Sequence, residues 1–216
     1  MGFLASVMDI LFPPRCVFCR RFIRSGEPDI CSDCRGSLPF LEGSAAETAG
    51  EYFETCLSPL RCEGSVRAAV QRFTFKNAVG YADCFGALLA DCIRENLSGR
   101  YDIISWVPLS ETRLKTRGYD QAFLLAQAAA LSLDDIAVEL LVRHTDAKAQ
   151  ASLTDHSERQ ENVKGVFAVT DPELAAGKRI LLIDDVVTSG ATLSECARTL
   201  LEAGALSVVC AALAKG

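Results

Sequence analysis

Long apolar segments and an excess of positive charge are both missing from this chain. No apolar run approaches the ~20 residues that a helix needs to span a membrane, so we expect no transmembrane segment. The formal net charge is −6, and the isoelectric point is near 5.0. This acidic balance argues against a broad nucleic-acid-binding face, with a local basic groove as the alternative.

Histidine is also scarce, and one common nucleotide-binding motif is absent. His144 and His156 are the only two histidines, and their spacing matches no pair of metal ligands. A G-x-x-x-x-G-K-[ST] sequence does not occur, which excludes a P-loop. The hydrophobic N-terminal stretch MGFLASVMDILFPP lacks a positively charged start and is interrupted by Asp9. We therefore expect no secretory signal peptide and a cytoplasmic protein.

Cysteine, in contrast, is abundant: the chain has ten. In a reducing compartment, closely spaced pairs indicate a metal rather than disulfides. Cys16 and Cys19 form one C-x-x-C pair, and Cys31 and Cys34 form a second after eleven intervening residues. Two such pairs can complete a closed, tetrahedral Cys₄ shell. We predict a structural Zn²⁺ site whose chelation unfolds this module; a redox dithiol and incidental core cysteines are the alternatives.

The region around these cysteines is rich in arginine and is followed by a polar, acidic stretch. We interpret the arginines as a solvated surface, with contact to an anionic partner as the alternative. Residues 41–55 read as a linker or the start of a short strand pair. We therefore place a zinc-ribbon-like module with its linker at residues 1–58 and a second domain at 59–216. The arginines are Arg15, Arg20, Arg21, Arg24 and Arg35.

Residues 180–204, ILLIDDVVTSGATLSECARTLLEAG, contain the most informative pattern. A short apolar run predicts a strand that ends at Asp184 and Asp185, and a polar loop then leads into a helix that ends before Gly204. In an open parallel sheet this order places the loop at the carboxyl edge, where ligands bind. The helix is indicated by the spacing of Leu193, Ala197, Leu200 and Leu201.

This loop combines small residues with hydroxyl groups in front of a predicted helix. Free backbone N–H groups at a helix start suit a phosphate, and Thr188, Ser189 and Thr192 can add hydroxyl donors. The two acids can accept hydrogen bonds from vicinal sugar hydroxyls or hold Mg²⁺. The pattern favours a site for a phosphorylated sugar. The alternative is that the acids merely end a strand before an ordinary turn.

A second cluster of candidate residues follows the predicted strand Tyr101 to Pro108. Arg113, Lys115 and Arg117 lie within five residues, and in a loop beside a phosphate site they would neutralise pyrophosphate. A solvated basic loop is the alternative. Lys76 lies between two predicted helices, where a solvated position is the alternative to a ligand role.

The remaining pattern alternates helices with buried strands, which predicts an α/β fold with a parallel sheet. Helical spacing runs from Ser65 to Phe73, from Ala78 to Ile93 and from Asp120 to Leu131. Between the predicted strands Val138 to Val142 and Phe167 to Val169, residues 143–165 are polar and contain almost no core positions. Such a segment in a compact domain is typical of a lid or a binding loop.

The stretch LLIDDVVTSGAT closely resembles the phosphoribosyl pyrophosphate (PRPP) binding signature of type I phosphoribosyltransferases. The resemblance implies a phosphoribosyltransferase-like parallel sheet in which Asp184 and Asp185 contact the ribose hydroxyls of Mg²⁺-bound PRPP. It also implies that the 5′-phosphate is bound by Thr188, Ser189, Gly190, Ala191 and Thr192.

The order of motifs along the whole chain resembles the ComF family, with its ComFC- and GntX-like members. The zinc module is followed by R-F-x-F-K, VP-x(8)-RGYDQ and R-x(6)-Q-x-x-L-x(5)-R-x-x-NV-x-G-x-F, and then by the PRPP signature. Family members commonly have Thr where this chain has Ala147. The positions that match the family pattern are Arg117, Gly118, Gln121, Arg143, Gln150, Arg159 and Asn162.

With this resemblance, our first hypothesis is an enzyme that transfers phosphoribosyl, a pentosyl group, to an unidentified acceptor, with the basic loop near Arg117 stabilising the departing pyrophosphate. The resemblance also associates the chain with DNA uptake in natural competence or with gluconate utilisation. One alternative is a non-catalytic adaptor that senses PRPP or a nucleotide while its zinc module docks a competence or DNA-processing partner. Another is direct binding of single-stranded DNA, which the acidic balance and the single Trp106, inside a predicted strand, disfavour.

Overall fold

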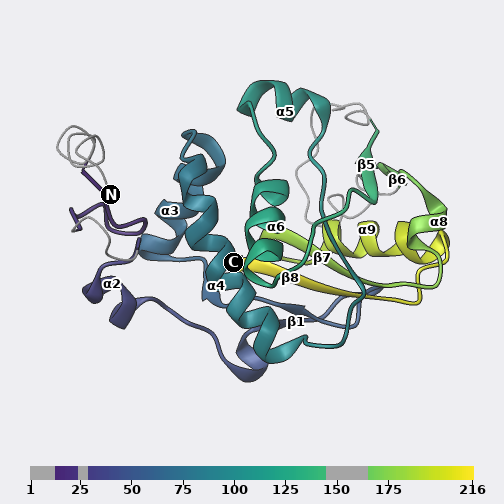
Figure 1. The fold of residues 1–216 in the computed structure, drawn as a ribbon, viewed down its shortest axis with the longest axis horizontal. Coiled ribbons are helices and arrows are strands. Elements are labelled where there is room, and N and C mark those ends of the chain that lie inside the picture. Colours follow the sequence, from purple (N-terminus) through teal and green to yellow (C-terminus); the bar gives the residue numbers. More distant parts are fainter. Residues whose placement is uncertain (1–12, 24–28, 145–164) are drawn as a thin grey trace.

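The structure, a computed structural model, describes residues 13–23, 29–144 and 165–216 (Figure 1). Its centre is a six-stranded sheet in the order β1-β2-β8-β7-β4, with β3 also paired to β8. All strand pairs in this sheet are parallel except β1 with β2. The strands are β1 (Glu47–Thr48), β2 (Cys56–Leu57), β3 (Leu60–Arg61), β4 (Ile103–Trp106), β7 (Arg179–Val187) and β8 (Ser207–Lys215).

The two central strands, β7 and β8, are the longest, and their middles are continuous apolar runs. Residues 180–183 and 208–214 are all buried, as is typical of strands covered on both faces. The predicted strand over Ile180 to Ile183 is therefore too short. Strand β7 continues through Asp184 and Asp185, with Val186 still in register with Ala214 of β8, so the acids lie within the strand and not after it.

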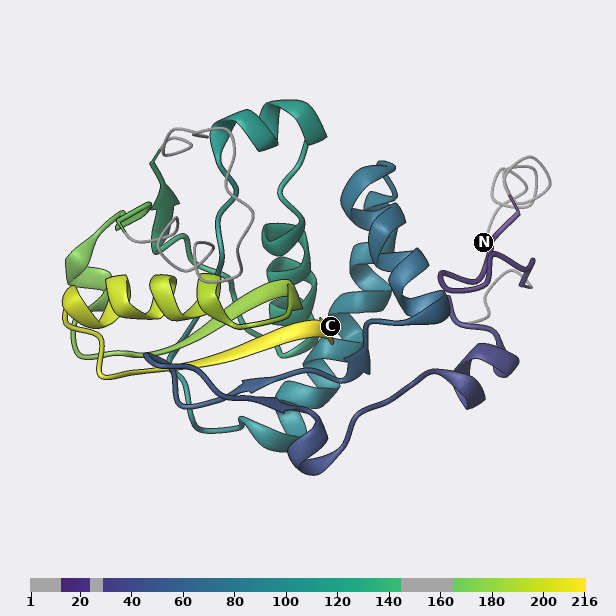
Figure 2. The same ribbon diagram turned by 180° about the vertical axis from the view of Figure 1, so that it is seen from behind.

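Helices cover both faces of the sheet. Successive residues of a strand point to opposite faces, and β7 accordingly sends Leu181 and Ile183 to one hydrophobic cluster and Ile180 and Leu182 to another. The first cluster includes α3 (Gly64–Phe75), α4 (Ala82–Asn96) and α6 (Gln121–Ser132); the second includes α9 (Ala191–Glu202). Figure 2 shows α9 running along β7 and β8.

Strands β5 (Leu141–Arg143) and β6 (Phe167–Val169) form a separate antiparallel pair. The prediction of a strand of the parallel sheet over Val138 to Val142 was therefore wrong: only Ala137 makes a parallel bridge, to Ile104. Leu140 and Leu141 bury their side chains in the cluster of α9. That packing draws the chain away from the sheet edge.

The predicted basic loop after β4 is a short helix, α5 (Glu111–Arg117). The side chain of Ser110 accepts a hydrogen bond from the Arg113 N–H and caps its start. Gly118 ends it with φ of +81°, a left-handed conformation that favours glycine. Both signals were present in the sequence, in SETRLKTRG.

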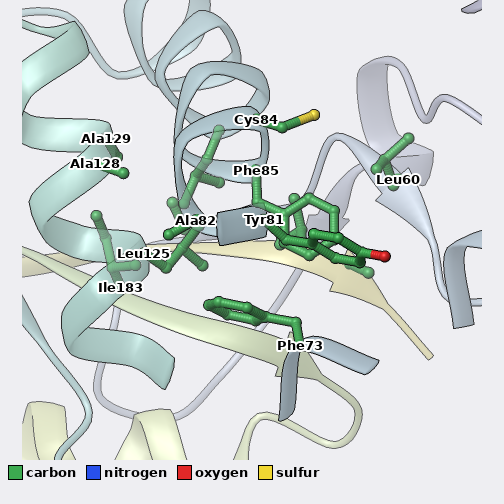
Figure 3. Packing of buried hydrophobic residues seen from close by; sticks show 14 of the residues in the cluster. Leu60, Phe73, Tyr81, Ala82, Cys84, Phe85, Leu125, Ala128, Ala129 and Ile183 are labelled. Carbon is green, nitrogen blue, oxygen red and sulfur yellow. The ribbon is translucent and has the colours of Figure 1, made fainter. Parts of the chain in front are cut away.

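Short helical turns complete the fold, and the N-terminal segment packs onto the rest. The turns are α2 (Ser32–Ser37), η1 (Gly43–Ala45), η2 (Val79–Tyr81) and α8 (Pro172–Ala175). Phe73, Tyr81 and Phe85 pack together in the same hydrophobic cluster as Ile183 of β7 (Figure 3). Phe18 of the N-terminal segment joins them, with its ring centroid 5.9 Å from that of Phe85. No helix among the described residues is long and apolar enough to cross a bilayer.

Candidate functional site

A cleft with a volume of about 680 Å³ lies where β7 and β4 end at the carboxyl edge of the sheet. One side is formed by Asp184, Asp185, Thr188 and Thr192. The four cations that line it come from three different elements, α3, α5 and β5, so charges of both signs converge in one concavity. These cations are Arg67, Arg113, Arg117 and Arg143.

The two acids are adjacent in β7 and differ in their surroundings. Asp184 Oδ1 accepts a hydrogen bond from the backbone N–H of Asp185 at 2.8 Å. Burial, and then the neighbouring charge of Asp185, raise the pKa of the Asp184 carboxyl well above its usual value. Asp185 Oδ2 instead accepts a hydrogen bond from Thr74 Oγ1 at 3.1 Å. A cation placed between the acids would offset their repulsion.

The loop after β7 forms a small hollow of about 50 Å³ that adjoins the cleft, lined by residues 186–193 together with Asp184. Gly190 begins α9 with φ of +74°, a conformation that glycine adopts without strain. The first N–H groups of a helix have no partner within it, so those of α9 face an anion-sized space. Ser189, Gly190 and Ala191 line this hollow, while Thr188 and Thr192 line both it and the cleft.

Two of the three predicted cations, Arg113, Lys115 and Arg117, lie at the cleft. Arg113 and Arg117 line it, while Lys115 points elsewhere on α5 and forms an exposed pair with Glu111. Arg117 is well anchored: its Nη1 donates to Gln121 Oε1 at 2.8 Å, and its guanidinium lies 4.7 Å from the centroid of the Phe75 ring. Arg113 and Arg117 are about one helical turn apart and share a face, whereas Lys115 lies about half a turn from each and faces solvent.

Helix α3 contributes a wall of the cleft that the sequence analysis did not assign. Arg67, Gln71, Thr74 and Phe75 line it, and the spacing 67, 71, 74 places three polar residues on one helical face. In the sequence, the only signal for this wall was that three polar residues share one face of a helix expected to pack on the core. Lys76 directly follows the helix and is exposed outside the cleft.

Several other predicted residues can be located or fall outside the described ranges. Gln121 and Arg143 line the cleft, and His144 is exposed. Trp106 is only 8% exposed in β4, so it offers no stacking surface. Ala147, Lys148, Gln150, His156, Arg159 and Asn162 lie outside the residues that the structure describes.

The four predicted zinc ligands meet in the N-terminal segment. The sulfur atoms of Cys16, Cys19, Cys31 and Cys34 all lie within 4.8 Å of one another, and Cys19 and Cys31 are 3.6 Å apart. A tetrahedron with Zn–S bonds of ~2.3 Å has sulfur atoms about 3.8 Å apart. The cluster therefore fits a closed zinc shell.

The local electrostatics also favour a thiolate in this cluster. Burial opposes ionisation of Cys16, but hydrogen bonds from the backbone N–H groups of Cys19, Cys31 and Phe18 outweigh it and lower the pKa of the thiol to about 6. Burial and the neighbouring thiols raise the pKa of Cys34. A bound cation would stabilise all four thiolates together.

Comparison with known families assigns both parts of the chain. Residues 7–63 match the double zinc ribbon domain, and residues 120–216 match the phosphoribosyl transferase domain. Competence protein F of Haemophilus influenzae is 29% identical over 215 residues, which cover 88% of this chain and 92% of that protein. These findings support a ComF-family, phosphoribosyltransferase-like protein with an N-terminal zinc module.

Further relatives of this ComF-family chain have similar names. Competence protein ComFC of Bacillus subtilis is 25% identical over 205 residues, covering 85% of this chain and 82% of that protein. DNA utilization protein YhgH of Escherichia coli is 35% identical over 107 residues, covering 50% and 46%. A solved allosteric regulatory enzyme of purine biosynthesis is 16% identical with a TM-score of 0.46, covering 66% of this chain and 30% of that one.

The two domain matches, the named relatives and the geometry support the predicted family and confirm the predicted fold class. The ComF-family chain has an α/β fold with a mostly parallel, phosphoribosyltransferase-like sheet and an N-terminal Cys₄ zinc module. The zinc-ribbon match and the four-cysteine cluster together support a structural zinc.

Proposed function

We propose that the cleft binds Mg²⁺-PRPP and that the chain transfers the phosphoribosyl group to an acceptor. The observation that carries this proposal is the convergence of Asp184 and Asp185, the hollow at the start of α9, and Arg113 and Arg117 in one cleft. PRPP has a 5′-phosphate, two ribose hydroxyls and a pyrophosphate. The cleft offers an anion cradle, two carboxylates and guanidinium groups that complement them in turn.

In the proposed reaction, the bond between the anomeric carbon and the pyrophosphate oxygen breaks, and its electron pair leaves with pyrophosphate. A lone pair of the acceptor forms the new bond to that carbon, and the acceptor releases its proton to solvent. Arg117 stabilises the charge that develops on the departing pyrophosphate. Its position is held by the Gln121 amide and the Phe75 ring, so little reorganisation accompanies the reaction.

The described residues fit a magnesium ion that arrives with PRPP. Carboxylate and phosphate oxygens are its preferred ligands, and the two adjacent acids of β7 leave a repulsion that a cation relieves. When bound, Mg²⁺ would supply charge neutralisation for the pyrophosphate. Asp184 and Asp185 would hold the ribose hydroxyls and this cation together.

Calorimetric titration with PRPP, with and without Mg²⁺, tests the site. We expect Mg²⁺-dependent binding in the wild-type chain and its loss in the Asp184→Asn/Asp185→Asn double variant. Asp91→Asn/Glu95→Gln is a matched control, because it also removes two acids but from the far end of α4, outside the cleft. Equal affinity in the wild type and the cleft double variant would refute the assignment.

One observation supports a second candidate, a non-catalytic adaptor. Among the described residues that line the cleft, Asp184 and Asp185 are the only side-chain carboxylates, and no histidine is present. Both acids are assigned to ribose and metal, so they leave no further carboxylate or histidine among the described cleft-lining residues to act as general base. In this alternative the chain senses PRPP or a nucleotide, and its zinc module docks a partner that processes DNA or serves competence.

Pyrophosphate release from PRPP across a panel of acceptors separates the two candidates. Release above the rate without protein supports the transferase. Binding without release supports the adaptor, to which the names of the competence and DNA utilization relatives lend weight. Direct binding of single-stranded DNA would instead show a steep loss of affinity with salt.

A further inference from the structure

The zinc module is attached to helix α3 by one arginine. Arg72 Nη2 donates hydrogen bonds to the backbone carbonyls of Val17 and Phe18, each at 2.8 Å. These are the two residues between Cys16 and Cys19, so the guanidinium holds the inside of the first C-x-x-C turn. A planar group that binds two carbonyls at once fixes both the position and the orientation of that turn.

The attachment is reinforced by aromatic packing on the same turn. Phe18 is only 2% exposed and packs on Phe85, which in turn meets Phe73 edge-on at 5.4 Å and Tyr81 at 5.8 Å. Arg72 Nε also donates to the Tyr81 hydroxyl at 3.3 Å. The zinc turn is therefore packed against both α3 and α4 rather than tethered loosely to them.

The residues after Arg72 reach the candidate site. The carbonyl of Phe73 accepts a hydrogen bond from the Tyr119 hydroxyl, and Thr74 Oγ1 donates to Asp185. A helix rises ~1.5 Å per residue, so about 3 Å of helix axis separates the arginine that holds the zinc turn from the threonine that holds the acid. A displacement of this last turn of α3 therefore moves both Arg72 and Thr74.

We infer that Arg72 is a positioning residue through which the zinc-loaded Cys16–Cys19 turn holds Thr74 and Asp185 in the geometry that binds Mg²⁺-PRPP. The inference rests on the proposed PRPP site. Zinc orders the turn, the turn holds Arg72, and the last turn of α3 holds the acid. Because coupling between two ligands is reciprocal, Mg²⁺-PRPP strengthens zinc binding by the same factor by which zinc strengthens PRPP binding.

The reciprocal effect can be measured on the full chain by competition for zinc with a chromogenic chelator. We expect saturating Mg²⁺-PRPP to raise the zinc affinity of the wild type about tenfold. The increase falls below about twofold in Arg72→Met and is partly restored in Arg72→Lys, whose ammonium can still donate to both carbonyls. A residue that merely supported folding would lower zinc affinity without removing its response to PRPP.

Arg20→Met is the matched control. Arg20 Nη1 donates to the same Tyr81 hydroxyl at 2.6 Å, but it lies in the zinc module and not on α3. We expect this variant to keep the response of zinc affinity to PRPP. If Arg20→Met and Arg72→Met lose that response equally, or if the wild type binds PRPP without any change in zinc affinity, the inference is wrong.

A second measurement, made without PRPP, keeps this inference distinct from the proposed function. Amide hydrogen exchange should accelerate at residues 72–75 and 184–187 when zinc is chelated, and also in zinc-loaded Arg72→Met. The buried segment 180–183 serves as the internal control. Unchanged exchange at the first two segments, or equal acceleration in all three, overturns the inference. The expected pattern in a chain that fails to bind PRPP supports the link and refutes the proposed ligand.

Discussion

Thr74 and Asp185 lie 111 positions apart in the chain, and the Thr74 hydroxyl donates a hydrogen bond to Asp185 Oδ2 at 3.1 Å. Thr74 is only 6% exposed, so its hydroxyl has little access to water as an alternative partner. A hydrogen bond donated to a carboxylate stabilises its charged form. Helix α3 therefore forms part of the candidate site as well as packing on the sheet.

Replacing Thr74 with valine keeps the shape of the side chain and removes this donor. We expect Thr74→Val to weaken Mg²⁺-PRPP binding about tenfold, since a hydrogen bond to a charged group contributes ~1.5 kcal/mol or more. Calorimetry measures the change. Thr199→Val is the control, because the Thr199 hydroxyl bonds only within α9, to the Glu195 carbonyl at 2.9 Å. Equal losses in the two variants would contradict a specific role for Thr74.

The raised pKa of Asp184 predicts that this acid destabilises the ligand-free protein at neutral pH. Burial and the charge of Asp185 raise the pKa in the folded state above the unfolded value near 3.9. The stabilising contribution of the protonated form is therefore complete below the unfolded pKa and is lost as pH rises through the folded pKa. Asp184→Asn should raise the free energy of unfolding at pH 7.5 by about 0.5–2 kcal/mol while abolishing PRPP binding.

Urea unfolding of the wild type and of Asp184→Asn at several pH values checks this expectation. The difference between them should grow from pH 4 toward pH 7.5. Asparagine can keep the hydrogen bond that Asp184 Oδ1 accepts from the Asp185 N–H, so local geometry is retained. If Asp184→Asn is less stable than the wild type at every pH tested, other interactions in the ligand-free protein already offset the cost of burying the charged Asp184 carboxylate.

We expect PRPP binding and pyrophosphate release to depend on the planar guanidinium group of Arg117 and not only on its positive charge. It stacks 4.7 Å above Phe75 and donates to Gln121 at 2.8 Å, and a lysine ammonium cannot reproduce the stack and the planar fork together. Arg117→Lys should lower PRPP affinity or pyrophosphate release about tenfold. Arg94→Lys is the control, since Arg94 pairs with Asp91 on the exposed side of α4. Wild-type behaviour of Arg117→Lys would indicate that charge alone suffices.

The crossing of α4 and α6 should tolerate no side chain at Gly86. A Cβ there would lie 2.4 Å from Ala128 Cβ and 2.8 Å from the Ala129 backbone nitrogen, so one helix must move. We expect Gly86→Ala to lower the free energy of unfolding by about 1–3 kcal/mol, measured by urea denaturation. Gly80→Ala is the control, because a Cβ at Gly80 meets nothing within 4 Å. A stability loss as large in Gly80→Ala would refute the steric explanation.

Removal of one zinc ligand should loosen the N-terminal segment. We expect about one zinc ion per wild-type chain and its loss in Cys16→Ser, together with a lower Tm because Phe18 leaves its place against Phe85. Elemental analysis and thermal unfolding provide the two measurements. Cys92→Ser, outside the four-cysteine cluster, should retain the metal. Zinc retained in Cys16→Ser would place the metal elsewhere.

The zinc cluster and the strand-loop-helix pattern were readable in the sequence because both are local. Two C-x-x-C pairs carry their own geometry, and the run LLIDDVVTSGAT places acids, hydroxyls and a helix start within a dozen residues. The alternation of apolar strands and helices likewise predicted the α/β fold. The boundaries were less accurate: β7 extends past Ile183 to Val187 because β8 continues to pair with it.

The sequence by itself determined the chemistry of the parts, namely four thiols for a metal, two adjacent acids and a loop suited to phosphate. Tertiary structure decided which of the cations reach them. Arg117 faces the cleft and Lys115 faces solvent because of the side on which α5 lies against the cleft. It also decided that α3 connects Val17 with Asp185 through Arg72 and Thr74. Contacts between residues more than 50 positions apart depend on packing across the whole core, and no local pattern specifies them.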